Sequence, residues 1–263
     1  MYKLEEFFAI LDEIAPIKYS YALVDRGEYD NSGIIVARHD NVKRVLFSLD
    51  LSIDAVKKAK SNNCDTIVTH HPAIYRPIRS IGVSDDTVAL SSAVKEGLNV
   101  ISMHLNLDVA AYGIDRSLAE GLEGKNIEIL DVLENGVGYG RKFESDKTVS
   151  QLKEIIKRNF KTQRTLFYGD KNRLIKTAAC FCGGGSSHAE KMLSNGKLAN
   201  VDLIVTSDMP HHLIKRFTEA GINLILLTHY AAENYGFKKF YEKVKAKTTA
   251  GCEVLFFEDR KFM

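Results

Sequence analysis

The 263-residue sequence predicts an α/β fold with mostly parallel strands, because short apolar runs rich in strand-forming residues alternate with segments of helical spacing. In the first half of the chain the predicted strands are 44–50, 64–71 and 99–104. The predicted helices that follow them are 52–63, 85–97 and 114–124. Strands that alternate with helices form βαβ units, and such units build a parallel sheet.

Local signals at the helix ends support these assignments. Ser52 precedes the first helix, and a serine there accepts a hydrogen bond from a free backbone N–H group. Acidic residues begin the segment 85–97 and Gly97 ends it, which is typical of a helix. Farther along, Thr148 and Gln151 have the spacing of a capping box in front of another helix.

The second half of the chain repeats the alternation after a change in composition. The stretch ENGVGYGRKF around Gly136 is rich in glycine and predicts a hinge or turn. A chain of this length is long for one compact core. We therefore interpret it as two α/β lobes. Residues 1–127 and 201–263 form the lobe that carries the candidate site, and residues 128–200 form a second lobe inserted into the first.

The composition excludes several classes of protein. Hydrophobic residues make up 45% and charged residues 27% of the chain, as in ordinary globular proteins. A net charge of +2 argues against a general nucleic-acid-binding protein, which would carry a clustered basic face. No apolar run approaches the ~20 residues of a spanning helix, and the amphipathic start differs from a signal peptide, so we expect a cytoplasmic protein. The four cysteines include no C-x-x-C pair, so we expect free thiols.

Three of the apolar runs end in side chains that bind divalent metals. One ends in two adjacent histidines. Each of the other two ends in a histidine with a carboxylate four residues later, which puts both side chains on one face of a helix. Ligands of α/β sheets bind outside the carboxyl ends of the strands, and a mixture of imidazole and carboxylate suits zinc, iron or manganese. The candidate ligands are His70, His71, His104, Asp108, His229 and Glu233.

The adjacent histidines favour a site with two ions. Successive residues of an extended chain point to opposite sides, and Pro72 favours extended geometry at His71. His70 and His71 are therefore better placed to reach two different ions than to chelate one. Two ions ~3.5–4 Å apart with a bridging carboxylate are a known catalytic arrangement, and Glu233 is the candidate bridge. Two divalent ions outweigh two carboxylates, so the site favours an anionic group such as a phosphate.

Each motif by itself also has an ordinary explanation. A histidine pair at the end of a strand is commonly part of a turn. A histidine and a carboxylate four residues apart are commonly a surface pair on a helix. We favour the metal site because all three motifs close an apolar strand within one α/β pattern.

Five stretches resemble the NIF3-like proteins, also called dinuclear metal centre hexameric proteins: YDNSGIIV, TIVTHHPAIYRPI, HLNLDVAAYGID, GVGYGR and INLILLTHYAAE. The resemblance runs through most of the chain and implies two divalent ions per chain, a homohexamer, and a histidine at position 104 that is either a ligand or a proton-handling catalytic neighbour. The implied metal ligands are His70, His71, Asp108, His229 and Glu233. Some members carry the name GTP cyclohydrolase 1 type 2.

The chain departs from the family pattern in IIVA and in the glycine turn CGGGSSH (182–188), and we expect neither to touch the proposed ligands. The glycine turn has two interpretations, an anion-binding helix N-terminus or a tight packed turn. We favour the packed turn, with His188 exposed. The stretch SDMPHHL, with Asp208, His211 and His212, is a candidate to line the site, and Asp30 in a DNSG turn is a candidate neighbour of it.

The expected function is metal-dependent hydrolysis of a small anionic, nucleotide-like substrate. Metal-bound water ionises near neutral pH and attacks as hydroxide, which requires the open ligand positions that a six-donor site around two ions leaves. The alternative is a non-catalytic metal-binding or regulatory oligomeric assembly. Binding of DNA is disfavoured by the charge balance.

Overall fold

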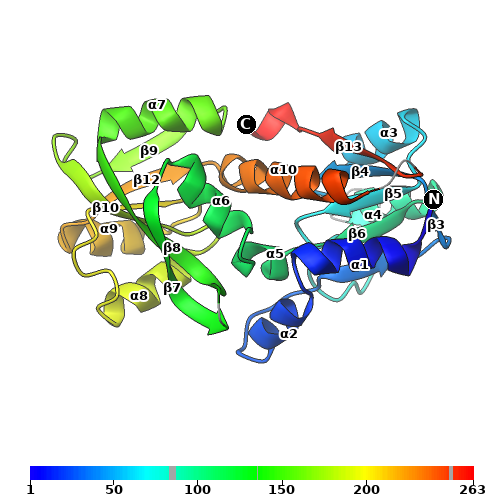
Figure 1. Cartoon of the computed structure of the whole chain (residues 1–263), viewed down its shortest axis with the longest axis horizontal. Helices are drawn as coiled ribbons and strands as arrows, with labels where there is room; N and C mark the ends of the chain where they lie inside the picture. The colour runs from blue at the N-terminus through cyan, green and yellow to red at the C-terminus, as the bar shows by residue number, and fades with distance from the viewer. Residues whose placement is uncertain (83–86, 135, 249–250) are drawn as a thin grey trace. The chain divides into compact units, whose positions relative to one another are not determined.

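The computed structural model describes residues 1–82, 87–134, 136–248 and 251–263. The chain forms two compact units (Figure 1). Met1–Leu107 and Phe237–Asp259 make up the first, and Asp108–Gly236 and Arg260–Met263 make up the second. Most of the second unit is one continuous stretch of sequence that lies between the two parts of the first. The bounds differ from the expected 128–200, because strands beyond residue 201 join the sheet of the second unit.

The first unit is built on a five-stranded sheet. Its strand order is β13 (Glu253–Phe257), β4 (Arg44–Ser48), β5 (Thr66–Thr69), β6 (Asn99–Ser102) and β2 (Gly33–Val36). β13, β4, β5 and β6 run parallel, and β2 is antiparallel to β6. In this register Ser48 pairs with Thr69 and Thr69 pairs with Ser102. The chain therefore leaves β4, β5 and β6 at the same edge of the sheet.

Helices cover both faces of this sheet. α3 (Ile53–Ser61) and α4 (Thr87–Lys95) pack on one face, where their apolar side chains join Leu46 and Ile67 in the core. Phe47 points to the other face, because side chains alternate along a strand, and its ring lies 6.0 Å from that of Phe237. Ser52 caps α3 as predicted, since its hydroxyl accepts a hydrogen bond from the backbone N–H of Ala55 at 3.1 Å. The other elements of this unit are β1 (Tyr2–Lys3), α1 (Leu4–Ile14), α2 (Lys18–Val24) and β3 (Asn41–Val42).

The second unit is built on a six-stranded mixed sheet. Its strand order is β7 (Lys125–Glu134), β8 (Val137–Thr148), β10 (Leu174–Cys180), β11 (Leu203–Thr206), β12 (Asn223–Leu227) and β9 (Thr165–Tyr168). The three central strands β10, β11 and β12 are parallel. Cys180 pairs with Val205, and Val205 pairs with Ile225. The segments that follow these strands therefore also leave the sheet at one edge.

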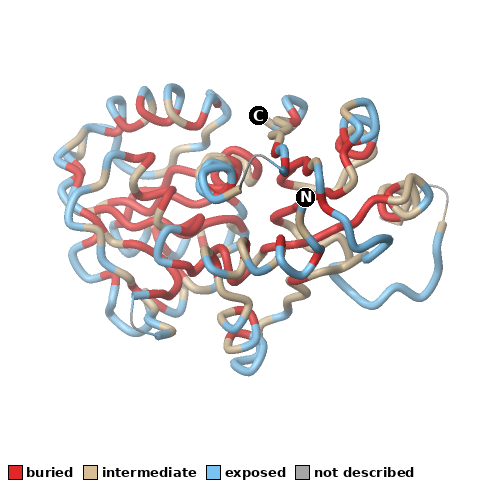
Figure 2. The backbone as a smooth tube through the Cα atoms, turned by 45° about the vertical axis from the view of Figure 1, so that its right-hand side comes forward, coloured by how far each residue is buried: buried red, intermediate tan, exposed pale blue. Residues whose placement is uncertain are grey.

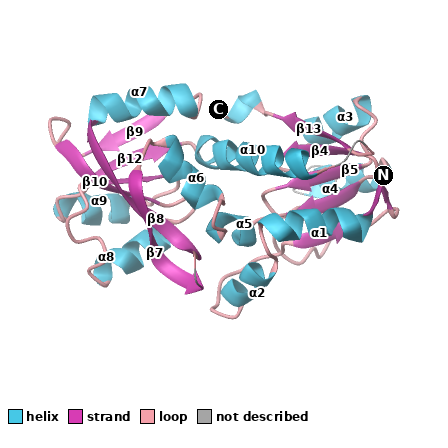
Figure 3. Cartoon of the chain, viewed as in Figure 1, coloured by secondary structure: helices cyan, strands magenta, loops and turns pink. Residues whose placement is uncertain are grey.

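This second sheet lies between two helical layers (Figure 3). α6 (Ile114–Gly121), α7 (Val149–Asn159) and the start of α10 (His229–Lys247) contribute to one core cluster, and α8 (Ser186–Ser194) and α9 (His211–Glu219) contribute to the other. The predicted capping box of Thr148 and Gln151 is present at the start of α7. β11 and β12 are buried along their length, whereas β10 is buried mainly toward its end (Figure 2). The remaining elements are α5 (Leu105–Val109) and the short helix η1 (Arg260–Phe262).

The glycine-rich stretch contains the predicted turn at Gly136 itself, but the residues from Val137 onward are strand. β7 and β8 form a long antiparallel hairpin there. Gly138 and Gly140 lie within β8 and have positive φ angles of 153° and 67°. A Cβ atom on Gly138 would lie 2.2 Å from the carbonyl oxygen of Asp131, and one on Gly140 would lie 2.5 Å from the ring of Phe181. These glycines permit close packing inside the sheet rather than a change of direction.

The described residues bear on two expectations, one about membrane-spanning helices and one about the cysteines. Among them, no helix combines the length and the apolar character that crossing a membrane requires. All four cysteines are free, as expected, and all four are buried.

Candidate metal centre

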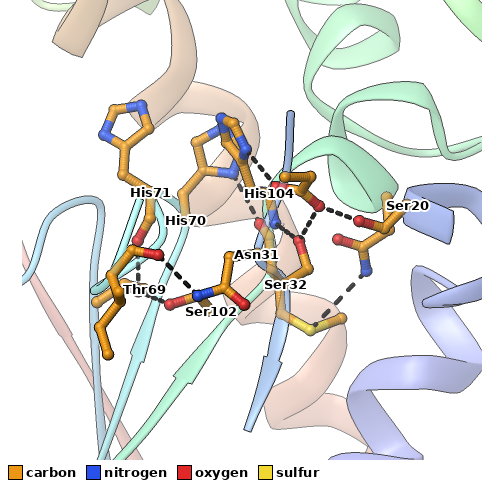
Figure 4. A network of polar contacts seen from close by, with 12 residues as sticks. Ser20, Asn31, Ser32, Thr69, His70, His71, Ser102 and His104 are labelled. Atoms are coloured by element: carbon orange, nitrogen blue, oxygen red, sulfur yellow. Dashed lines mark hydrogen bonds and ion pairs between the residues drawn. The ribbon is translucent and has the colours of Figure 1, made fainter. Parts of the chain in front are cut away.

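Three histidines of the first unit gather at the edge where β4, β5 and β6 end. The backbone N–H groups of His70 and His71 both donate to the carbonyl of Leu49, at 3.0 Å each. His104 follows β6, and its ring lies 5.3 Å from that of His70 and 5.8 Å from that of His71 (Figure 4). One ring nitrogen from each of the three histidines lies within 4.8 Å of the others. The aligned ends of the strands thus place three imidazoles where one or more metal ions could bind.

Each of these imidazoles is held through Nδ1. The Nδ1 atom of His70 lies 2.8 Å from the carbonyl oxygen of Met103. Nδ1 of His71 lies 2.6 Å from Asp50, and Nδ1 of His104 lies 2.7 Å from Asp30. Because carbonyl and carboxylate oxygens accept hydrogen bonds, the ring proton resides on Nδ1, and Nε2 of the neutral ring carries a lone pair. Histidines that bind metals almost always donate their other N–H in this way.

The partner of His104 is itself fixed in a buried network. The side chain of Asp30 is fully buried and also accepts hydrogen bonds from the hydroxyls of Ser20 and Ser32, the second at 2.7 Å. Ser32 in turn accepts a hydrogen bond from the backbone N–H of His104 at 3.0 Å. Burial raises the pKa of the Asp30 carboxyl, but the hydrogen bond and charge of His104, with the two hydroxyls, bring that pKa below its usual value. Asp30 therefore stays ionised and orients the imidazole.

The geometry of the adjacent histidines differs from the sequence expectation. β5 ends at Thr69, so the alternation of an extended strand does not govern His70 and His71. Their rings lie 5.0 Å apart and tilt by 43°, instead of pointing to opposite sides. Their backbone N–H groups share one acceptor, and their Nδ1 atoms have different ones. Whether they bind separate ions remains a prediction.

The second unit contains the other predicted histidine and its carboxylate. α10 begins at His229, directly after β12, so Glu233 follows one turn later on the same face. Nε2 of His229 lies 3.0 Å from Glu233, as predicted from the spacing. Nδ1 of His229 lies 2.6 Å from Asp208. A ring that faces carboxylates on both sides requires a positive charge between Nε2 and Glu233, either a proton or a metal ion.

The glycine turn after β10 contacts this pair, contrary to expectation. A Cβ atom on Gly183 would lie 2.1 Å from Oε1 of Glu233 and 3.0 Å from Nε2 of His229. Gly183 also has a φ angle of +48°, which favours glycine. The expected tight turn is present, since the N–H of Gly185 donates to the carbonyl of Cys182 at 2.9 Å. The turn packs against the candidate ligands themselves.

A buried carboxylate that the sequence analysis did not single out, Asp115, holds this turn. Asp115 accepts hydrogen bonds from the backbone N–H groups of Cys182 at 2.7 Å and Gly140 at 2.6 Å. Burial raises the pKa of the Asp115 carboxyl, although the charge of Arg141 opposes the rise. Asp115 stands inside an ordinary amphipathic helix, and no local pattern distinguishes it from a surface carboxylate.

Buried carboxylates concentrate negative charge around the same turn. Asp108 and Glu233 are both buried. Burial raises the pKa of the Cys182 thiol well above its usual value, and the charges of Asp108, Asp115 and Glu233 add to the rise. Buried carboxylates require compensating positive charge. A divalent cation fits this set of donors, because carboxylate oxygens and imidazole nitrogens suit zinc, iron and manganese.

Other candidates from the sequence have different outcomes. Asp208 contacts His229, whereas His211 and His212 are exposed at the start of α9. His188 was expected to be exposed, but it stacks on Tyr139 with ring centroids 4.1 Å apart and 14% of its side chain exposed. Its stacking on a strand of the hairpin explains this burial.

The sequence matches one known family over nearly its whole length and is similar to named bacterial proteins. The family described as Duf34/NIF3 (NGG1p interacting factor 3) matches residues 2–261. A GTP cyclohydrolase 1 type 2 homolog of Clostridium perfringens is 28% identical over 98% of this chain and 97% of its own length. One of Clostridium acetobutylicum is 28% identical over 88% of this chain and 85% of its own length.

Solved structures share the fold. The Staphylococcus aureus hypothetical protein SA1388 matches with a TM-score of 0.83 and 23% identity, over 99% of this chain and 98% of its own. A Bacillus cereus protein related to NIF3 matches with a TM-score of 0.82 and 17% identity, over 97% and 96%. The match to the family over nearly the whole sequence, together with this mixed α/β fold, means that the chain belongs to the Duf34/NIF3 family.

Proposed function

We propose that the chain binds two divalent metal ions and is a hydrolase for a small anionic, nucleotide-like substrate. The proposed metal ligands are His70, His71, Asp108, His229 and Glu233. The observation that carries the proposal is the hydrogen bonding of the histidines. All three proposed histidine ligands, and His104, have Nδ1 against a carbonyl or a carboxylate, which directs a lone pair or a positive charge to Nε2.

The roles of the ligands follow from their chemistry. Glu233 has two carboxylate oxygens, so it is the residue proposed to bridge two ions. His70 is fully buried, and 26% of the His71 side chain is exposed, so His71 lies nearer to an incoming substrate. When bound, the two ions would supply a nucleophilic hydroxide near neutral pH and stabilise negative charge.

His104 is proposed to move a proton. Its Nδ1–H donates to the buried carboxylate of Asp30, which stabilises a positive charge on the ring. Nε2 of His104 can then accept a proton from the attacking water and return it to the leaving group. A histidine serves this purpose because its ordinary pKa lies near neutral pH.

The substrate class follows from charge and from the names of relatives. Two divalent ions bring four positive charges, and the ligands Asp108 and Glu233 remove two. The remaining positive charge favours an anionic substrate. Relatives aligned over most of their length are named GTP cyclohydrolase 1 type 2 homolog, which supports a nucleotide-like substrate.

The test is the metal content per chain, measured by elemental analysis on protein purified without added metal. We expect about two ions per chain in the wild type and fewer than about one in Glu233→Gln, which keeps the shape of the side chain but loses its charge. Glu242→Gln, an exposed position on the same helix, is the matched control and should retain both ions.

Turnover is then measured for the metal-loaded wild type on nucleotides and phosphoesters. Hydrolysis that falls in His104→Gln, at unchanged metal content, would support the mechanism. Absence of stoichiometric metal in the wild type even after reloading would refute the proposal. Full metal loading without turnover of any member of the panel would favour a regulatory assembly instead.

A further inference from the structure

A cavity of about 720 Å³ opens beside His71 within the first unit. Its wall runs from Asp50 and His71 along the segment 72–80, which follows β5, to Thr87 and Leu90. Cavities of ~300–1,000 Å³ typically bind small molecules. The cavity therefore has the size of a substrate site and includes one of the proposed metal ligands in its wall.

The base of this wall is fixed to the sheet. The backbone N–H of Ala73 donates to the hydroxyl of Ser102 at 3.1 Å, and the side-chain amide of Asn31 donates to the carbonyl of Ile74 at 2.7 Å. Pro72 and Pro77 restrict the backbone on either side. Because Ala73 and Ile74 are held in place, the segment that follows them begins at a fixed position next to the histidines.

Two arginines give the cavity wall a positive charge. Arg76 and Arg79 line it, and both are exposed. Within the described residues neither guanidinium forms an ion pair with a carboxylate, whereas Arg44 pairs with Glu253. Guanidinium groups match the geometry of phosphate oxygens and bind them with paired hydrogen bonds. Because neither guanidinium is paired with a carboxylate in the part of the chain that the structure describes, both are open to an anionic ligand there.

The same wall carries an aromatic surface close to the histidines. The ring of Tyr75 lies 6.1 Å from that of His104 and nearly perpendicular to it, at 83°. The ring of Tyr29 supports it edge-on, at 5.2 Å. Tyr75 is 46% exposed, so part of its ring is open to a ligand. Aromatic side chains in this situation stack on nucleobases.

Asp50 is the acidic residue among the described cavity-lining residues, and its charge has a partner. Its carboxylate accepts the hydrogen bond from Nδ1 of His71 at 2.6 Å. Among the described lining residues the two arginines outnumber it, so the ionised groups described there sum to a positive charge. An anion that enters beside the arginines therefore meets net attraction.

We infer that this cavity binds the phosphate groups of a nucleoside phosphate through Arg76 and Arg79, with the base against Tyr75. The claim that this cavity is the substrate site rests on the proposed function, because His71 is both a wall residue and a proposed metal ligand. The binding of phosphate itself needs no metal. Arg76, Arg79 and Tyr75, all in the segment after β5, then determine which ligand the cavity prefers.

The test uses the full-length protein freed of metal with a chelator and then dialysed. Isothermal titration calorimetry measures the Kd for GTP and for inorganic tripolyphosphate. Arg76→Ala/Arg79→Ala should weaken the binding of both probes by about ten-fold or more. The control Arg38→Ala/Lys57→Ala removes the same charge from exposed positions of the same unit outside the cavity, and should change Kd by less than about three-fold.

A third variant separates the phosphate from the base. Tyr75→Leu should weaken GTP several-fold and leave tripolyphosphate unchanged, because only GTP carries a ring to stack. Urea unfolding of each variant checks the fold, which exposed substitutions should preserve.

Three results would overturn the inference: no binding of either probe by the wild type, an unchanged Kd in Arg76→Ala/Arg79→Ala, or an equal loss in the control. These outcomes are separate from the metal measurement. Arginine-dependent binding by a protein that never retains metal would sustain the inference and refute the proposed hydrolase. Retained metal together with phosphate binding that does not depend on the arginines would refute the inference about the cavity and leave the proposed hydrolase standing.

Discussion

The substitution Gly183→Ala places a methyl group against the proposed bridging ligand. The added Cβ would lie 2.1 Å from Oε1 of Glu233 and 3.0 Å from Nε2 of His229. Cβ atoms essentially never approach a non-bonded heavy atom within 3.0 Å, so the carboxylate must retreat by about 1 Å. The backbone cannot relieve the contact freely, because the N–H of Cys182 is held by Asp115.

Two effects of different size follow from this change. The φ angle of +48° costs a non-glycine residue about 1–2 kcal/mol of folding stability. A ligand displaced by about 1 Å loses its bonding geometry. Loss of a residue that merely orients a ligand costs about 10–100-fold in metal affinity, so displacement of the ligand itself should cost roughly 100-fold or more.

Two glycines serve as controls for the separate effects. Gly196 has a φ angle of +71° and nothing within 4 Å of an added Cβ, so Gly196→Ala reproduces the strain without the contact. Gly184 lies in the same turn, also with open space, so Gly184→Ala tests the turn itself. Metal affinity is measured by competition with a chromogenic chelator, and stability by urea unfolding of the metal-free protein. The reasoning is refuted if Gly183→Ala binds metal like the wild type, or if Gly196→Ala loses as much affinity.

Two further predictions concern other carboxylates of the second unit. Asp208→Asn removes the charged acceptor of Nδ1 of His229, so metal affinity in the same chelator assay should fall by about 10–100-fold; unchanged affinity would show that Asp208 does not orient the ring. Burial raises the pKa of Asp202, but the backbone N–H groups of 176–177 and the guanidinium of Arg173 together bring that pKa below its usual value. A lowered pKa in the folded state stabilises the protein above the unfolded pKa of about 3.9, and the contribution disappears as the pH falls through the folded value. Asp202→Asn should therefore destabilise the protein near pH 7, and its difference from the wild type in urea unfolding should shrink below about pH 4; a difference independent of pH would contradict this origin.

Local interactions made much of the fold predictable. Strands β4, β5 and β6 and the helices between them follow from apolar periodicity, and the caps at Ser52 and Thr148 follow from side chains that reach only three residues ahead. The pairing of His229 with Glu233 belongs to the same class, because helix geometry alone brings residues four apart together.

The sequence misled where local appearance and tertiary pairing disagree. β11 and β12 look like a return to the first lobe, yet they pair with β10 in the second unit. Which strands pair depends on contacts between residues far apart in the sequence. Apolar runs of similar composition therefore do not show which sheet each strand joins. The predicted turn is present at Gly136, but the other glycines of that stretch, Gly138 and Gly140, serve close packing within β8.

By itself the sequence determined an α/β chain of the Duf34/NIF3 family and the identity of the candidate ligands, because both depend on residue types and short spacings. Only the tertiary structure decided what surrounds those ligands. Asp30 is 74 residues from His104 in the chain, and Gly183 is brought against Glu233 by the aligned ends of parallel strands. Such contacts depend on strand register and on the exit of loops from a sheet, and no pattern within a short window of sequence carries that information.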